Sequence, residues 1–283
     1  MINNKILKAI NNNIFETIKK HSDELNIECY VIGGYVRDLL LNKSAPKDID
    51  VLVIGNGIEM AKKVSNELNP KEKVKVFKNF GTAMFKFNNI EVEFVGSRKE
   101  SYNQSSRNPI VKLGTLEDDL NRRDFTINAI GVGLNSKNWG KLIDNFNGIE
   151  DLKNGLIKTP LDPLKTFSDD PLRMLRAIRF SCQLNFKIHT DSLNGIISEK
   201  DRIKIISGER IADELNKIIM TQKPSTGFKI LESTGILKLI LPELTALKGI
   251  DEIDGQKHKD NFYHTLEVLD NICPNTNNIW LRW

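Results

Sequence analysis

"KDIDVLVIG", residues 47–55, predicts a buried β-strand that nevertheless begins with two carboxylates. Side chains alternate along a strand, so Asp48 and Asp50 point to the same face, with Cα atoms about 7 Å apart. Ile49, Val51 and Val53 point to the other face, into a core. Two like charges on one face repel each other, and a bound cation is the simplest way to keep both ionised at neutral pH. Carboxylates placed in this way suit magnesium, which would activate a phosphate reaction.

A short Asp-x-Asp pattern also has a simpler explanation, because acids at a solvated strand entrance can cap nearby amides. A Gly-Gly turn just upstream, in GGYVRDLL, favours the metal site. Gly33 and Gly34 let the backbone approach a ligand, and the helix that follows offers its first amides to an anion. Arg37 lies on the first turn of that helix, where it could bind a triphosphate. Downstream, the strand IEVEFVG supplies a third carboxylate, Glu91 or Glu93.

The order of the expected elements divides the chain in two. Strands and helices follow one another up to residue 150, which predicts an α+β domain with a mixed sheet flanked by helices. Helical periodicity dominates from residue 170, so we expect a domain boundary at 155–165. The elements expected in the first domain are an amphipathic helix over 3–25, strands in ECYVIGG, IDVLVIG, VKVFKNF, AMFKF and IEVEFVG, helices over 35–42 and 57–68, and a polar loop over 98–115.

The composition is that of an ordinary soluble globular protein. The 283 residues are 40% hydrophobic and 28% charged, and the net charge of +4 permits an anionic partner without requiring one. Cys29, Cys182 and Cys273 are far apart and odd in number, so we expect reduced thiols in a cytoplasmic protein. The polar N-terminus and the lack of a long apolar run argue against a signal peptide or a membrane span.

A second functional pattern, DDPLRMLRAIRF, lies in the helical part of the chain. Asp170 and Pro171 suit the start of a helix. Arg173, Arg176 and Arg179 then form one stripe, because residues three apart lie on the same helix face. The stripe has no matching row of acids, so its charges repel one another unless they face phosphate or a base. A solvated basic face is the alternative explanation.

Five motifs in a fixed order, GGYVRDLLL, DIDVLV, RRDFTINAI, DDPLRMLRAIRF and GERIADEL, closely resemble the class II tRNA nucleotidyltransferases and bacterial poly(A) polymerases, which are DNA polymerase β-like nucleotidyltransferases. The resemblance runs from about residue 28 to the C-terminus. It implies a catalytic nucleotidyltransferase head over 1–155, a helical neck for base recognition and RNA binding over 156–225, and a partial helical body over 226–283. It also implies that Glu209 and Arg210 steady the neck without taking part in the chemistry.

The resemblance gives the arginine stripe a role in choosing the base. Asp170 would accept a hydrogen bond from the exocyclic amine of cytosine or adenine, and Arg173 would donate to the adjacent ring nitrogen. Guanine and uracil present the reverse pattern, and each buried group left unpaired costs about 1–3 kcal/mol. Arg176 and Arg179 would extend the nucleotide site. The family often has Glu-Asp where this chain has Asp169 and Asp170, a departure that leaves the base-reading pair intact.

RRDFTINAI resembles the family's ribose-recognition motif. Arg123 is the strongest candidate for a nucleotide contact, with Asp124 and Asn128 behind it, and Asp124 would also suit a helix cap. Glu93 is preferred over Glu91 as the third acid, because its spacing to the next arginine is the one that the family shows.

The implied reaction is attack of a tRNA 3′-hydroxyl on the α-phosphate of CTP or ATP, which adds CMP and AMP without a template and releases pyrophosphate. Asp48 and Asp50 would hold Mg²⁺, and Gly34 and Arg37 would position the triphosphate. Within the family, a poly(A) polymerase or an enzyme that adds only CC or only A is also compatible with these motifs. Outside it, a non-catalytic RNA-binding protein on the same scaffold, or a transferase that modifies protein or a small molecule, remains an alternative.

KHKDNFYHTLEVLDNI, residues 257–272, resembles the opening of an HD-type helical domain, in which His258 or His264 could begin a metal site. The His-Asp pair that should follow is absent, so we expect no metal there. We expect a chain truncated at the start of this domain, with apolar surface left uncovered near Trp280 and Trp283. Such a surface favours self-association and would weaken binding to tRNA.

Overall fold

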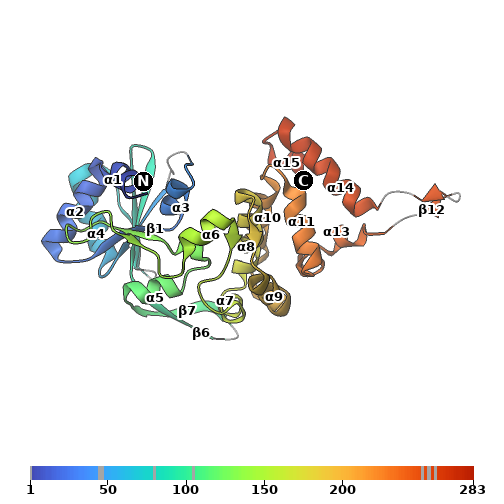
Figure 1. Cartoon of the computed structure of the whole chain (residues 1–283), viewed down its shortest axis with the longest axis horizontal. Helices are drawn as coiled ribbons and strands as arrows, with labels where there is room; N and C mark the ends of the chain where they lie inside the picture. The colour runs from blue at the N-terminus through green and yellow to red at the C-terminus, as the bar shows by residue number, and fades with distance from the viewer. Residues whose placement is uncertain are drawn as a thin grey trace. The chain divides into compact units, whose positions relative to one another are not determined.

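A computed structural model describes residues 2–43, 48–78, 81–103, 106–249, 252–253, 256–257 and 260–283 (Figure 1). The chain divides into two compact units, residues 1–101 with 109–154, and residues 102–108 with 155–283. Most of the strands belong to the first unit and most of the helices to the second, which confirms the α+β class.

A seven-stranded mixed sheet forms the centre of the first unit, in the order β3-β4-β5-β2-β1-β8-β9. β2 and β5 run parallel, and the other neighbouring pairs run antiparallel. The five predicted strands are therefore confirmed, as β1 Cys29–Ile32, β2 Asp48–Val53, β3 Lys75–Phe77, β4 Thr82–Phe87 and β5 Ile90–Gly96. The short strands β8 Gly131–Gly133 and β9 Leu142–Ile143 were not predicted.

Helices flank this sheet. α2 packs against α4, and α4 packs against β4 and β5, so the apolar residues of α4 and of the central strands form a common core. The helices of this unit are α1 Ile2–Ile10, α2 Asn13–Leu25, α3 Gly34–Leu40, α4 Gly57–Leu68, α5 Leu116–Asn121 and α6 Gly148–Asn154, with a 3₁₀ turn at Thr126–Asn128.

The prediction of one helix over residues 3–25 is wrong, because Asn12 ends the first helix and begins the second. Its backbone is extended, at φ −151°, and its side-chain oxygen accepts hydrogen bonds from the amides of Ile14 and Phe15 at 3.1 and 3.3 Å. Asparagine is a favoured N-cap for this reason. The apolar periodicity continues across the break and conceals the cap, since Ile6 and Ile10 of α1 and Ile14 and Ile18 of α2 are all buried.

The prediction of a polar loop over residues 98–115 is also wrong. β6 Arg98–Asn103 and β7 Ser106–Leu113 pair as a two-stranded sheet. Backbone hydrogen bonds between two strands do not require apolar side chains, so a polar hairpin leaves little signal in the hydrophobic pattern.

The second unit is mainly helical, although β10 Leu156–Ile157 and β11 Lys187–Ile188 pair within it in parallel. α8 packs against α10 and α11, and α11 packs against α14. The remaining bounds are α7 Pro163–Asp169, α8 Leu172–Leu184, α9 Thr190–Glu199, α10 Gly208–Ile219, α11 Pro224–Ser233, α12 Ile236–Ile240, α13 Pro242–Ala246, α14 Asn261–Ile272 and α15 Ile279–Arg282, with short strands β12 Glu252–Ile253 and β13 Gln256–Lys257.

Candidate active site

The acids of β2 and β5 meet on one face of the sheet. In the parallel register of these strands, Asp48 lies opposite Glu91 and Asp50 lies opposite Glu93. Glu91 forms an exposed ion pair with Lys86, with 3.0 Å between Nζ and Oε1. Glu93 instead lines the same pocket as Asp50. The register thus places the preferred third acid, Glu93, beside Asp50, although a catalytic role for it stays a prediction.

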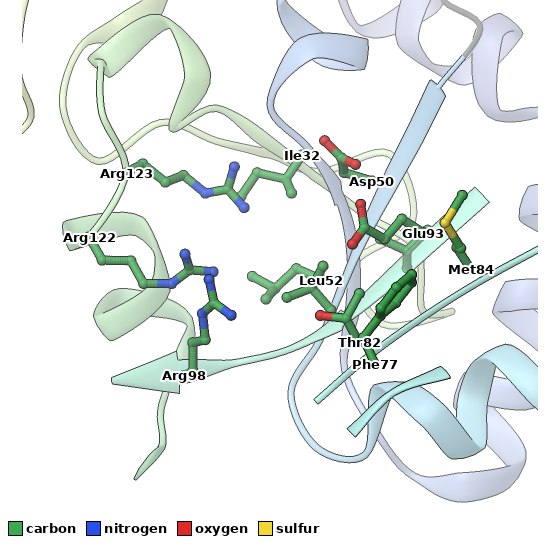
Figure 2. Close-up of a pocket in the computed structure, with 12 residues that line it drawn as sticks. Ile32, Asp50, Leu52, Phe77, Thr82, Met84, Glu93, Arg98, Arg122 and Arg123 are labelled. Carbon is green, nitrogen blue, oxygen red and sulfur yellow. The ribbon is translucent and has the colours of Figure 1, made fainter. Parts of the chain in front are cut away.

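A pocket of about 480 Å³ opens over this face of the sheet. Figure 2 shows Arg98, Arg122 and Arg123 reaching into it from one side, while Asp50 and Glu93 lie on the opposite side. Opposite charges on two walls of one pocket suit a ligand that carries phosphate together with a cation.

Two carboxyl groups in this pocket resist ionisation. Burial is the main cause that raises the pKa of Asp50; Arg123 lowers this pKa and Asp48 raises it. Burial likewise raises the pKa of Glu93, and the charge of Asp50 raises it further, while Arg98 opposes the shift. Neighbouring carboxylates that repel each other are stabilised by a divalent cation, so the donor set fits a metal.

The described residues contain no cluster of three or more His, Cys, Asp or Glu side chains that could hold an ion by itself. Mg²⁺ is usually bound in proteins by one or two carboxylates, together with water and substrate phosphates. Asp50 lines the pocket, whereas Asp48 is exposed and outside its described lining, so the binding of Mg²⁺ by this pair stays a prediction.

The Gly-Gly turn brings the backbone close to these side chains. Gly33 has φ 79° and ψ −129°, a backbone conformation that is unfavourable for any residue with a Cβ atom. A Cβ at Gly33 would lie 3.3 Å from Nη1 of Arg123 and 3.7 Å from Oδ2 of Asp50. Gly34 begins α3 directly after the turn. Glycine is therefore favoured where the chain passes close to Asp50 and Arg123. Nucleotide binding by Gly33 and Gly34 stays a prediction.

Arg37 contacts protein groups on two sides. Its guanidinium donates to both carboxylate oxygens of Asp38 at 2.9 Å, and its Nη1 donates to Oδ1 of Asn128 at 2.8 Å. Asn128 donates in turn to Oδ1 of Asp124 at 3.0 Å, and both of these residues are buried. The bond between Arg37 and Asn128 thus joins α3 to the RRDFTINAI segment, within which Asp124 holds Asn128. Arg37 does not belong to the described lining of the pocket, so its contact with a triphosphate stays a prediction.

Two charged residues of this site, Arg122 and Asp119, were not singled out from the sequence, and Arg98 served only as the arginine whose spacing favoured Glu93. Asp119 lies on α5 and is fully buried between the guanidinium groups of Arg122 and Arg123. The spacing could have revealed Asp119, because Arg122 follows it by three residues and Arg123 by four. Side chains at these two spacings lie on the same face of a helix.

In the second unit, Asp170 and Arg173 stand at the start of α8. The helix begins at Leu172, and Oδ1 of Asp170 accepts a hydrogen bond from the Leu172 amide at 3.2 Å. Arg173 is 9% exposed and donates from Nη1 to the backbone oxygen of Thr166 at 3.4 Å. Pro171, not Asp170, occupies the N-cap position of α8, so the expected position of the cap is one residue off. Base recognition by Asp170 and Arg173 stays a prediction.

The expectation that the arginine stripe has no matching acid is wrong. Nε of Arg179 lies 2.7 Å from Oε2 of Glu214 on α10, and both side chains are almost fully buried. Arg176 and Arg179 also lie over the ring of Phe180, at 5.4 and 4.2 Å from its centroid. Glu209 is exposed, so the acid that ties α10 to α8 is Glu214. Nucleotide contacts by Arg176 and Arg179 stay predictions.

The other sequence expectations concern cysteines, histidines and membranes. The three cysteines are free, and burial raises the pKa of Cys29 and of Cys182 to about 12. His264 is exposed on α14, and His258 lies outside the described residues. Within the described part of the chain, no helix has the length and apolar character needed to cross a bilayer.

Two family models match the chain. The poly A polymerase head domain matches residues 29–158, and a model described as "Probable RNA and SrmB- binding site of polymerase A" matches residues 185–248. The chain belongs to the tRNA nucleotidyltransferase and poly(A) polymerase family.

Curated relatives and solved structures agree with this assignment. The chain is 37% identical to an A-adding tRNA nucleotidyltransferase of Geobacter sulfurreducens, over 83% of this chain and 27% of the relative. It is 34% identical to a CCA-adding enzyme of Anoxybacillus flavithermus, over 83% of this chain and 56% of the relative. The chain thus spans between about a quarter and just over half of these relatives. The Thermotoga maritima CCA-adding enzyme complexed with tRNA superimposes with a TM-score of 0.77 at 30% identity, over 96% of this chain and 60% of that one.

Proposed function

We propose that this chain adds CMP and AMP from CTP and ATP to the 3′ end of a tRNA, without a template and with release of pyrophosphate. The observation that carries the proposal is the two-sided pocket of the first unit, in which Asp50 and Glu93 face three arginines next to the Gly33 turn. CTP and ATP both bring a triphosphate and its cation, which match the two walls.

The chemistry follows from the carboxylates. Asp48 and Asp50 would hold Mg²⁺, which when bound lowers the pKa of the attacking hydroxyl and stabilises the leaving pyrophosphate. Arg123 is already oriented toward Asp50 and contacts the triphosphate or the ribose. Asp170 and Arg173 select cytosine and adenine through a carboxylate acceptor and a guanidinium donor, because both bases pair an exocyclic amine with a ring-nitrogen acceptor.

A second candidate function is addition of the terminal A alone, which the names of three relatives support: those of Aquifex aeolicus, Geobacter sulfurreducens and Halalkalibacterium halodurans are A-adding tRNA nucleotidyltransferases. The structures of relatives with tRNA, with an ATP analogue and with CTP support RNA and both nucleotides as substrates. A cytoplasmic location and self-association are further predictions.

The test is incubation of the chain and Mg²⁺ with labelled CTP or ATP and two tRNAs, one lacking all of CCA and one ending in CC. Incorporation of C and then A supports the proposal, A added only to the CC end supports the second candidate, and a long A tail supports a poly(A) polymerase. The variant Asp50→Asn should abolish incorporation in every case. A wild-type chain that incorporates nothing would contradict the proposal.

A further inference from the structure

Asp119 is a buried carboxylate that lies behind the basic wall of the nucleotide pocket. Its side chain has no exposed area, whereas the two arginines that it contacts, Arg122 and Arg123, are 17% and 19% exposed. Both arginines line the pocket, and Asp119 does not belong to the described lining. Asp119 therefore reaches the pocket only through its two partners.

Each carboxylate oxygen of Asp119 serves a different arginine. Oδ1 accepts from Nε of Arg122 at 2.8 Å and also from its Nη2. Oδ2 accepts from Nε and Nη2 of Arg123, at 3.2 and 3.0 Å. Each guanidinium thus donates twice from one edge to a single oxygen, and two contacts restrict its orientation more than one contact would.

A third contact completes the orientation of Arg123. Its Nη1 donates to the backbone oxygen of Asn128 at 3.3 Å, close to the Gly33 turn. The same guanidinium lines the pocket, so its contacts with Asp119 and Asn128 determine how it is presented to a ligand there. Asp119 carries one negative charge and its two arginines carry two positive charges, so the group has a net positive charge that suits phosphate.

We infer that Asp119 is a positioning residue that holds Arg122 and Arg123 as one rigid fork toward the phosphates of the bound nucleotide. This inference rests on the proposed function for the identity of the nucleotide. Preorientation matters because two loose arginines would lose side-chain freedom on binding, whereas arginines already fixed to a buried carboxylate do not. Arg122, which no motif assigned, becomes part of the nucleotide site.

The test compares Asp119→Asn with Glu117→Gln, an exposed acid two residues away on the same helix. Asparagine keeps the size of the side chain but offers one acceptor oxygen and turns an amide NH₂ toward the other arginine. We expect the Kd for CTP, measured without RNA by calorimetry with Ca²⁺ in place of Mg²⁺, to rise about tenfold in Asp119→Asn. Glu117→Gln should stay within twofold of the wild type.

A double-mutant cycle separates positioning from a purely structural role. If Asp119 acts through Arg123, adding Asp119→Asn to Arg123→Ala should change the Kd for CTP much less than Asp119→Asn does alone. Fully additive effects, or a Kd for Asp119→Asn equal to that of Glu117→Gln, would overturn the inference. Should Asp119→Asn not fold, Arg122→Lys keeps the positive charge and loses the two-point contact, and a wild-type Kd in that variant would also overturn it.

The binding measurement is independent of catalysis. A chain that binds CTP in an Asp119-dependent way but transfers no nucleotide would refute the proposed function and leave the inference standing. If the Asp119→Asn and Glu117→Gln variants transfer nucleotides equally well, with unchanged Kd and KM, the inference is refuted and the proposed function stands.

Discussion

Replacing Gly33 by alanine tests whether the Gly-Gly turn is shaped for the site rather than for the fold alone. The φ of 79° and ψ of −129° at Gly33 are strained for any residue with a Cβ, at a cost of about 1–3 kcal/mol. The added methyl group would also lie 3.3 Å from Nη1 of Arg123, which is tighter than an ordinary contact, and 3.7 Å from Oδ2 of Asp50. The guanidinium must therefore shift by a few tenths of an ångström.

The two consequences are measured separately. Denaturation by urea should show a loss of about 1–3 kcal/mol in the free energy of unfolding for Gly33→Ala. The kcat/KM for CMP incorporation should fall by about 10- to 100-fold, because small misplacements of groups around a reacting phosphate are costly.

Gly81→Ala is the matched control. Gly81 also has a positive φ, 63°, but a Cβ there meets no atom within 4 Å. This variant should lose about 1–2 kcal/mol of stability from backbone strain and keep its kcat/KM within about twofold. If Gly33→Ala loses no more activity than Gly81→Ala, the turn does not shape the site and the reasoning is refuted.

Three further outcomes follow from the charges. Because the pKa values of Asp50 and Glu93 are raised above their ordinary values, metal binding should weaken as pH falls through those raised values. A pH profile of kcat/KM should therefore show an acid limb that moves to lower pH as the Mg²⁺ concentration increases. Glu93→Gln should lower kcat more than Glu91→Gln in the incorporation assay, since only Glu93 lies beside Asp50, and equal effects would contradict the register argument. Glu214→Ala should lower the free energy of unfolding by about 3–5 kcal/mol, because it removes one partner of the buried ion pair with Arg179. Glu209→Ala on the same helix should change the free energy of unfolding by less than about 0.5 kcal/mol in a urea titration.

Local patterns in the sequence were sufficient to place the acids and the glycine turn. The alternation in IDVLVIG determines that Asp48 and Asp50 share a face, and the structure confirms the strand. The alternation in IEVEFVG could not decide between Glu91 and Glu93 as the third acid, because both point to the same face of the strand. Only the pairing of β2 with β5, which is a long-range property, places one of them beside Asp50.

Features that depend on distant parts of the chain were missed. The acid that pairs with Arg179 comes from α10, so no inspection of the arginine stripe could reveal it. The break at Asn12 was hidden because apolar periodicity continues through the cap. Asp119 was overlooked for a different reason: its spacing to the two arginines was visible, but its complete burial was not.

Binding of Mn²⁺ in the presence of CTP, followed by electron paramagnetic resonance, tests most directly whether the acids of β2 hold a divalent cation beside a nucleotide. The wild-type chain should bind Mn²⁺ with CTP at least about tenfold more tightly than Asp48→Asn or Asp50→Asn does, because each loses a charged ligand. Glu117→Gln, which removes an equal charge from an exposed site, should bind as the wild type does. Equal affinities in all four proteins would contradict the account.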